Sequence, residues 1–314
     1  MSVYTELTHQ QIDSILNDYQ IGKLLAFKGI AAGIENSNFF IDTEQGRYVL
    51  TIFERMNGEE LPYFMRLMAH LSAQGVTCPD VAQRSSHEKS SPFLFEINGK
   101  QGAIVSCMPG QVLDHLNEKQ LYSAAAGLAK LHLAGSSFPE QRKNPTDLGW
   151  LTQTIASIQK QVDINYGLNT SQLLNDEINW QQQQNCLSLP TGVIHGDYFC
   201  DNILFEGEQL SGIIDFYYAH TSPWIMDLAI AVNALAIQLQ EDDSSRMKNF
   251  LDGYQSIRAL TADEQKILPA MLRLSALRFW VSRLYDALNP REGAMTQIKD
   301  PKEYEYKLRR HRQT

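Results

Sequence analysis

One stretch of the chain combines polar residues whose types and spacing suit phosphoryl transfer. It reads His195-Gly196-Asp197-Tyr198-Phe199-Cys200-Asp201-Asn202, and the run Ile213-Ile214-Asp215-Phe216 follows it. Transfer of phosphate to a hydroxyl needs a carboxylate that orients the hydroxyl and accepts its proton. It also needs oxygen ligands for magnesium, and an Asn adds such an oxygen without adding charge. An Asp, an Asn and a second Asp at the end of an apolar strand therefore favour this chemistry over a set of unrelated turns.

Two hairpins and a helix are expected in the first third of the chain. Four apolar runs have the length of strands: 34–42, 48–53, 93–97 and 102–108. Glu44-Gln45-Gly46 separates the first pair, and Asn98-Gly99 separates the second, as in hairpin turns. Between the hairpins, Asn57-Gly58-Glu59-Glu60 has capping-box spacing, Pro62 follows in the first turn, and Gly75 ends the helix.

Helices dominate after Pro109-Gly110. They are predicted over 117–134, 150–160, 171–185, 224–240, 244–258 and 262–286, and in a basic tail after 301. Short strands are predicted over 192–195, 202–205 and 210–215. The order predicts an α+β protein with an antiparallel-sheet lobe over 1–107 and a mostly helical lobe over 108–314.

Composition and charge exclude several classes of protein. With 314 residues, 43% of them hydrophobic and 10% aromatic, the chain is not a disordered polymer. Its net charge of −9 argues against a general nucleic-acid binder, which depends on Lys and Arg. Four scattered cysteines without a Cys-x-x-Cys pair indicate reduced thiols. No targeting or membrane segment is recognisable, because polar residues interrupt the apolar stretch from Trp224 to Leu239. A cytoplasmic protein without membrane or nucleic-acid partners is expected, and its oligomeric state stays open.

From about residue 20 to 290, the sequence resembles the aminoglycoside-phosphotransferase and choline-kinase-like superfamily, whose members share the bilobal protein-kinase-like fold. The resemblance implies that Asp197 is the catalytic base and that Asn202 and Asp215 bind magnesium. Pro223-Trp224-Ile225-Met226-Asp227-Leu228-Ala229 also fits the family. We interpret Asp227 as a structural acid near a helix start. His132, in the family-like run Ala129-Lys130-Leu131-His132, is expected to be a hydrogen-bonded core histidine.

The resemblance also implies an ATP site in the first lobe. The segment from Gly29 to Phe39 corresponds to the family's phosphate flap, with Gly33, Asn36, Ser37 and Asn38 as nucleotide contacts, although a plain hairpin is the alternative. The hinge from Val105 to Gly110 would bond the adenine edge through its backbone, including Ser106. Met108 and Val49 would form apolar walls.

One position departs from the superfamily. The strand Val49-Leu50-Thr51-Ile52 has Thr51 where most members have the Lys that neutralises nucleotide phosphates. Arg47 or Arg55 could substitute, or magnesium could carry more of the neutralisation. A nucleotide-binding pseudoenzyme is the third possibility, and the intact Asp197, Asn202 and Asp215 argue against it.

Within the superfamily, the sequence is most similar to the branch that phosphorylates homoserine in threonine biosynthesis. Four segments carry this resemblance: 33–40, 48–54, 195–199 and 277–284. They imply transfer of the γ-phosphate of ATP, with Mg²⁺, to the hydroxyl of L-homoserine as the small-molecule substrate. Choline, methylthioribose and aminoglycosides remain alternative acceptors, and a nucleotide-binding regulatory module without turnover is an alternative of another class.

The acceptor pocket is the least determined part of the site. The carboxylate of homoserine needs a fixed cation, best an Arg. Arg278 and Arg283 on the last long helix are candidates, one of them for the pocket and the other for a surface pair, such as Arg283 with Asp286. Arg273 lies on the same helix. The aromatic residues Tyr198, Tyr217, Tyr218 and Trp224 either wall the pocket together with Asp197 or belong to the core.

Overall fold

A computed structural model describes residues 5–30, 36–56, 58–85, 91–184, 188–238, 243–290 and 299–313. The chain forms two compact units, which we call the first and second unit. The first contains 1–110 and 211–214, and the second contains 111–210 and 215–314. The predicted boundary between 107 and 108 lies close to the end of the first stretch.

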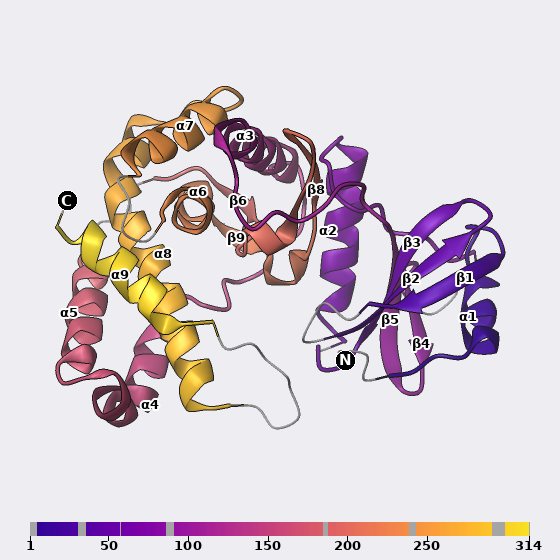
Figure 1. Ribbon diagram of the computed structural model, residues 1–314, viewed down its shortest axis with the longest axis horizontal. Helices are drawn as coiled ribbons and strands as arrows, with labels where there is room; N and C mark the ends of the chain where they lie inside the picture. The colour runs from indigo at the N-terminus through magenta and orange to yellow at the C-terminus, as the bar shows by residue number, and fades with distance from the viewer. Residues whose placement is uncertain are drawn as a thin grey trace. The chain divides into compact units, whose positions relative to one another are not determined.

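An antiparallel sheet of five strands forms the first unit, in the order β1-β2-β3-β5-β4 (Figure 1). Its strands are β1 (Leu24–Gly29), β2 (Asn36–Thr43), β3 (Gly46–Phe53), β4 (Leu94–Ile97) and β5 (Lys100–Ser106). The turn between β4 and β5 has positive φ at both Asn98 (51°) and Gly99 (73°), as the Asn-Gly signal predicts. Both predicted hairpins are confirmed.

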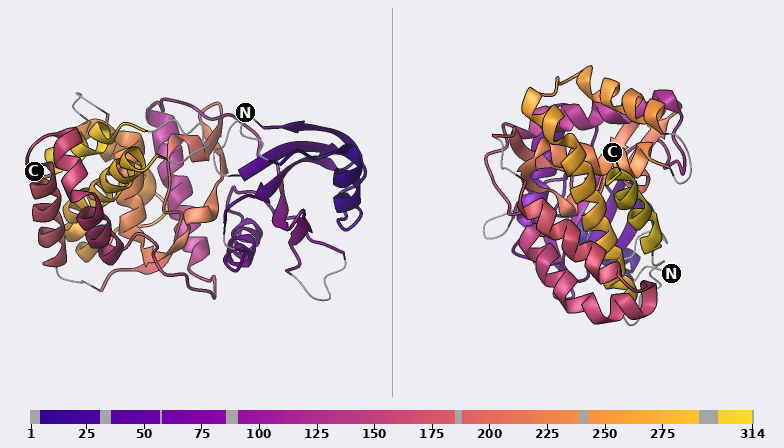
Figure 2. Two further views of the ribbon diagram at one scale, coloured as in Figure 1. Left: turned by 90° about the horizontal axis from the view of Figure 1, so that it is seen from below. Right: turned by 90° about the vertical axis from the view of Figure 1, so that its left-hand side faces the viewer.

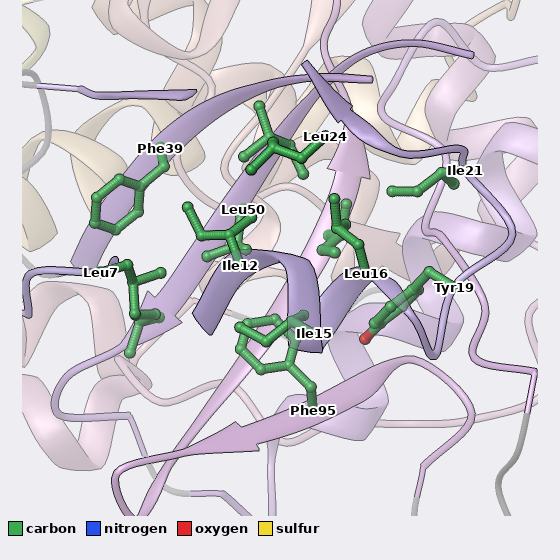
Figure 3. Close-up of a cluster of buried hydrophobic side chains, with 13 residues drawn as sticks. Leu7, Ile12, Ile15, Leu16, Tyr19, Ile21, Leu24, Phe39, Leu50 and Phe95 are labelled. Carbon is green, nitrogen blue, oxygen red and sulfur yellow. The ribbon is translucent and has the colours of Figure 1, made fainter. Parts of the chain in front are cut away.

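The two faces of this sheet differ, because side chains alternate along each strand. On one face, Phe39 and Leu50 join a buried apolar cluster with the helix α1 (His9–Leu16), as Figure 3 shows. Ile41 belongs to the same cluster. The other face carries half-buried or polar residues: Asn36, Asn38, Phe40, Val49 and Thr51. We call this second face the open face. The sequence had not predicted α1 or β1.

The helix α2 (Leu61–Ala73) follows the first hairpin and begins later than the capping signal suggested. Its N-cap residue is Glu60, whose side chain makes no capping hydrogen bond. Pro62 lies in the first turn as predicted, and Asn57 lies outside the described residues. Five apolar residues recur at helical spacing along α2, and all are buried: Leu61, Phe64, Met65, Met68 and Leu71.

The second unit is mainly helical. Its helices are α3 (Glu118–Gly135), α4 (Leu148–Tyr166), α5 (Thr170–Gln182), α6 (Trp224–Ala231), α7 (Ser244–Gln255), α8 (Ala262–Leu288) and α9 (Pro301–His311). The views of Figures 1 and 2 agree that α3 lies beside α7 and that α9 runs along α8. The predicted helix over 224–240 is shorter, since α6 ends at Ala231 and the chain continues as a π-helix over Val232–Ala236.

In the described part of the chain, four further short strands flank the polar motif. β6 (Thr191–Ile194) pairs with β9 (His220–Pro223), and β7 (Ile203–Glu206) pairs with β8 (Gln209–Ile213). The predicted α+β class, a sheet followed by helices, is confirmed. Among the described helices, none combines the length and apolar character needed to cross a membrane.

Candidate active site

The loop after β6 is held by a buried carboxylate. Asp227, in the first turn of α6, accepts hydrogen bonds from the backbone N–H groups of His195 (2.7 Å) and Gly196 (2.9 Å). Gly196 has a φ of 77°, and a Cβ there would lie 2.9 Å from the carbonyl oxygen of Tyr218. A side chain would therefore disturb this loop, and glycine is needed. Asp227 is structural, as predicted, but it binds this loop and not the start of its own helix.

Hydrogen bonds between buried side chains link Asp227 to His132 and His132 to Tyr254. His132 bonds Asp227 through Nε2 (3.1 Å), and its Nδ1 lies 2.7 Å from the hydroxyl of Tyr254. Burial lowers the pKa of His132 despite its contact with Asp227. The ring is therefore neutral, so Nε2–H donates to Asp227 and Nδ1 accepts from Tyr254. Although burial opposes ionisation of Asp227, the bond from His132 holds its pKa below the ordinary value. The expectation of a core histidine is confirmed.

Asp197 and Asn202 come together in this loop. The Nδ2 group of Asn202, which ends a short 3-10 turn (Cys200–Asn202), donates to the Asp197 carbonyl (2.8 Å) and to its carboxylate Oδ2 (3.0 Å). No described residue donates a hydrogen bond to Asn202 Oδ1. This amide therefore orients the carboxylate with one end and keeps an oxygen for a cation at the other.

Asp215 follows β8 in an unusual backbone conformation. Its φ of 62° and ψ of 65° lie in the left-handed region, which costs free energy for a residue other than glycine. Such strain is concentrated at functional sites. In the described part of the chain, no three His, Cys, Asp or Glu side chains gather as a metal site. Magnesium binding by Asn202 and Asp215 therefore stays a prediction.

Arg278 of α8 reaches the same loop. Its Nη1 donates to the carbonyl of Gly196 (2.7 Å), and its Nε donates to Thr146 Oγ1 (2.8 Å). Its Nη2 has no hydrogen-bond partner among the described residues. Arg278 is 4% exposed and lines a cavity of about 360 Å³ together with Asn144 and Asp147. Burial raises the pKa of Asp197, while the positive charge of Arg278 acts in the opposite direction.

The other two arginines of α8 have partners elsewhere. Arg283 pairs with Glu303 (2.6 Å) and not with Asp286, and it also donates to the carbonyl of Asp300 (2.9 Å). Arg273 binds both carboxylate oxygens of Glu177 (2.9 and 2.6 Å). Of the three arginines, Arg278 is the one in contact with the loop of Asp197.

Two of the predicted aromatic pocket residues lie in the core. Tyr198 is fully buried, and its hydroxyl donates to the carbonyl of Ala124 (2.9 Å). Trp224 stacks on His132 at 5.8 Å, and the guanidinium of Arg258 lies 4.6 Å from its ring centre. Their placement supports the core alternative. Tyr217 is half-buried near Asp215. Burial is the main cause that raises its pKa, and the negative charge of Asp215 acts in the same direction.

The predicted nucleotide contacts are distributed over the first unit. Asn38 and Thr51 are directly opposite each other on the open face, and Thr51 Oγ1 donates to Asn38 Oδ1 (2.8 Å). Asn36 and Val49 share this face. Ser37 points to the other face, where its hydroxyl bonds Glu54 (2.5 Å), so it is separated from Asn38 and Thr51.

Two backbone N–H groups of the predicted hinge already have hydrogen-bond partners within the first unit. Ser106 exchanges hydrogen bonds with Asp80, donating through its backbone N–H (2.8 Å) and accepting at its hydroxyl (2.9 Å). The N–H of Cys107 donates to the carbonyl of Arg47 (3.1 Å). Met108 follows the end of β5 and is half-buried. The predicted contact Gly33 lies outside the described residues.

The fold and this loop place the chain in a known class of enzymes. The sequence pattern of the phosphotransferase enzyme family matches residues 26–260, and the chain belongs to that family. It is 40% identical to the homoserine kinase of Methylobacillus flagellatus, over 97% of this chain and 93% of the relative. It is 39% identical to the homoserine kinase of Neisseria meningitidis, over 96% of each chain.

Solved structures support the same fold. One is an amicoumacin kinase in complex with AMP-PNP and Ca²⁺, with a TM-score of 0.70 and 14% identity, over 98% of this chain and 92% of that one. Another is a spectinomycin phosphotransferase in complex with ADP and spectinomycin, with a TM-score of 0.67 and 15% identity, over 98% and 95% of the two chains. The kinase-like fold that the resemblance implied is therefore confirmed.

A buried histidine beside the loop predicts sensitivity of the fold to acid. His220 of β9 is 2% exposed, its Nδ1–H donates to the Tyr218 carbonyl (2.8 Å), and its ring packs against Gly196. Burial lowers its pKa from 6.5 to about 4. Between pH 6.5 and about 4, His220 is therefore protonated in the unfolded chain but not in the folded one. The free energy of unfolding should fall by up to about 1.4 kcal/mol per pH unit as the pH drops through this window.

Urea denaturation at pH 7, 6 and 5 measures this slope. His220→Asn keeps a donor for Tyr218 without the titration, so its slope should be smaller than that of the wild type. His9→Asn, at an exposed histidine, is the matched control. An equal slope in His220→Asn and the wild type would contradict the assignment.

Proposed function

We propose that this chain is a homoserine kinase, which transfers the γ-phosphate of ATP to the hydroxyl of L-homoserine and releases O-phospho-L-homoserine and ADP. The observation that carries the proposal is the fixed Asp197 carboxylate. Its Oδ2 accepts a hydrogen bond from Asn202 Nδ2 (3.0 Å), and Arg278 donates to the Gly196 carbonyl in the same loop. The similarity to homoserine kinases over almost the whole chain supports the choice of acceptor.

In this proposal, Asp197 accepts the proton of the acceptor hydroxyl. A carboxylate whose pKa is raised by burial is a stronger base than an ordinary Asp. The bond from Asn202 directs its Oδ2, so one side of the carboxylate is fixed and the other can face the hydroxyl. Orientation and proton transfer are the two contributions that phosphoryl transfer requires from the protein at this point.

Magnesium fits the remaining oxygen donors. Asn202 Oδ1 and the carboxylate of Asp215 are hard ligands, and Mg²⁺ prefers oxygen. We assign the cation to these two residues. When bound, it neutralises charge on the nucleotide phosphates.

ATP belongs to the first lobe, over 1–107, and the catalytic and acceptor groups belong to the second, over 108–314. On the open face, Asn36, Asn38, Val49 and Thr51 are assigned to the nucleotide. Gly33, Ser106 and Met108 complete that set as the family resemblance suggests. Ser37 has the weakest support, because its hydroxyl binds Glu54 on the other face.

Arg278 is our candidate for the carboxylate of homoserine. Its Nη2 remains available, and its charge acts on Asp197, so a short amino acid held there would have its hydroxyl near the base. Arg283 is a weaker candidate because its guanidinium is engaged by Glu303. The cavity beside Arg278 also has walls of Leu148, Met226, Met271 and Leu274, which do not suit a zwitterion. We therefore assign homoserine to the side of Arg278 that faces Asp197.

Arg278→Lys is expected to raise KM for homoserine by roughly tenfold or more, since an ammonium cannot reproduce the guanidinium fork that spans Thr146, Gly196 and a ligand. It should lower kcat as well, because the bond to Gly196 is disturbed. Arg283→Lys is the matched control on the same helix, and its KM should change less than about twofold. Equal KM values for the two variants would remove Arg278 from the acceptor site.

The decisive experiment for the function is the release of ADP from Mg-ATP with homoserine, choline, methylthioribose or an aminoglycoside as acceptor. Strong dependence on homoserine, with O-phosphohomoserine as the product, supports the proposal. Dependence on another acceptor would assign the chain to a different kinase. Binding of ATP without turnover for any acceptor would favour the regulatory module.

A further inference from the structure

The open face of the sheet contains a neutral residue where charge compensation is needed. Thr51 lies in the centre of this face, and its hydroxyl is bonded to Asn38, another neutral group. If the proposed ATP site is correct, on which this inference rests, a cation besides magnesium would stabilise the triphosphate. Neither Thr51 nor Asn38 supplies one.

Three described cations of the first unit have acidic partners. Arg47 binds Asp42 with two nitrogens, at 2.6 and 3.0 Å. Lys100 pairs with Glu54, which holds Ser37 on the opposite face of the sheet. Arg84 pairs with Asp18 at 2.7 Å. None of these three is an available cation on the open face.

The register of the sheet places Lys28 on the open face. Lys28 of β1 is directly opposite Phe40 of β2, and Phe40 is directly opposite Val49 of β3. Directly opposite residues point to the same face. Phe27, the preceding residue, packs against the core cluster on the other face, as alternation requires.

Lys28 is also close to Thr51 on this surface. The row of Lys28, Phe40 and Val49 adjoins the row of Asn38 and Thr51. At about 4.8 Å between strands and 3.3 Å per residue, the Cα atoms of Lys28 and Thr51 are roughly 12 Å apart. A four-carbon side chain therefore allows Lys28 to approach phosphates bound over Thr51.

The ammonium of Lys28 is available. The residue is exposed, and among the described residues its side chain has no hydrogen-bond or ion-pair partner. We propose that Lys28 supplies, from β1, the positive charge for the nucleotide phosphates that Thr51 does not supply from β3. The contact is a salt bridge to phosphate oxygens and involves no covalent step.

Direct binding measurements separate a phosphate contact from a general structural effect. Lys28→Met should weaken binding of Mg-ATP by about tenfold while changing the affinity for adenosine less than twofold, since only the phosphates lose a partner. Lys28→Arg should retain most of the affinity. Lys23→Met, at an exposed lysine just before the same strand, is the matched control and should bind Mg-ATP like the wild type.

Moving the charge gives a second, independent test. In the wild-type background, Thr51→Lys should not raise kcat/KM for ATP, because Lys28 already serves the phosphates. In the Lys28→Met background, the same substitution should restore part of the lost ATP affinity. Such opposite effects are a sign of coupling between the two positions.

Two results would overturn the proposal. One is equal affinity for Mg-ATP in Lys28→Met and Lys23→Met. The other is a loss confined to Arg55→Met, an exposed arginine that follows β3. In both cases, homoserine-dependent release of ADP by the wild type would leave the proposed function intact. Conversely, a phosphate-specific loss in Lys28→Met without any homoserine phosphorylation would keep this inference and reject the homoserine assignment.

Discussion

Replacement of Asp197 by Asn is expected to lower kcat for homoserine phosphorylation by a factor on the order of 100 to 10,000. The substitution keeps the size of the side chain and an oxygen that can accept the bond from Asn202 Nδ2. It removes the negative charge and the basicity, and both are needed to orient the hydroxyl and take its proton. Because the Asn amide cannot accept the proton at any pH, the loss should be present across the neutral pH range.

A nearby aspartate offers a matched control. Asp201 lies in the same loop, but it is exposed and pairs with Lys299 at 2.9 Å. Asp201→Asn should retain kcat within about threefold, and both variants should bind Mg-ATP within about threefold of the wild type. The measurements are steady-state release of ADP and calorimetric titration with nucleotide. If Asp197→Asn kept more than a third of the wild-type kcat, the assignment of the base would be wrong.

The sequence predicted turns, helix starts and loop contacts that depend on residues close together in the chain. The Asn98-Gly99 turn needs two residues with positive φ, and this dipeptide favours that conformation. Asn117 and Thr261 form the capping boxes that start α3 and α8. The bond from Asn202 to Asp197 spans five residues of one loop, so the motif itself encodes it.

Elements that depend on distant partners were missed. β9 has four residues and exists because it pairs with β6, about thirty residues earlier. In β1, a bulge between Leu24 and Ala26 interrupts the alternation by which strands are recognised. The short helix α1 does have a signal, the capping box of Thr8 and Gln11. Because β1 was not predicted, the sequence could not place Lys28 on the open face, which requires the register of this strand.

The choice among the arginines of α8 shows the same limit. Arg273, Arg278 and Arg283 are spaced by five residues, which turns each one about 140° from the next around a helix. They must therefore face different neighbours, but the sequence does not reveal which neighbour each one meets. The contacts of Arg278 with Thr146 and Gly196 cross 132 and 82 residues of chain. Only tertiary packing brings these groups together.

The largest effect on stability is expected for Asp227→Ala. The carboxylate is completely buried and accepts three hydrogen bonds, from the N–H groups of His195 and Gly196 and from His132. Truncation leaves all three donors without this acceptor and leaves a cavity at a fully buried position. Removal of one partner from a buried charged network costs about 3–5 kcal/mol, and we expect at least this loss in the free energy of unfolding.

Two further variants keep this prediction testable if Asp227→Ala does not fold. Tyr254→Phe removes only the hydroxyl that donates to His132, and it should cost about 1–2 kcal/mol with little change in kcat. Asp252→Asn changes an exposed aspartate that pairs with Lys248, and it should stay within about 0.5 kcal/mol of the wild type. Urea denaturation at pH 7 gives the three values.

Asp227 binds the two residues that precede Asp197, so a folded Asp227→Asn protein should also lose kcat while its affinity for ATP is kept. A loss of stability without a loss of kcat would mean that the loop keeps its conformation without this anchor, and Arg278 alone would then have to hold Gly196.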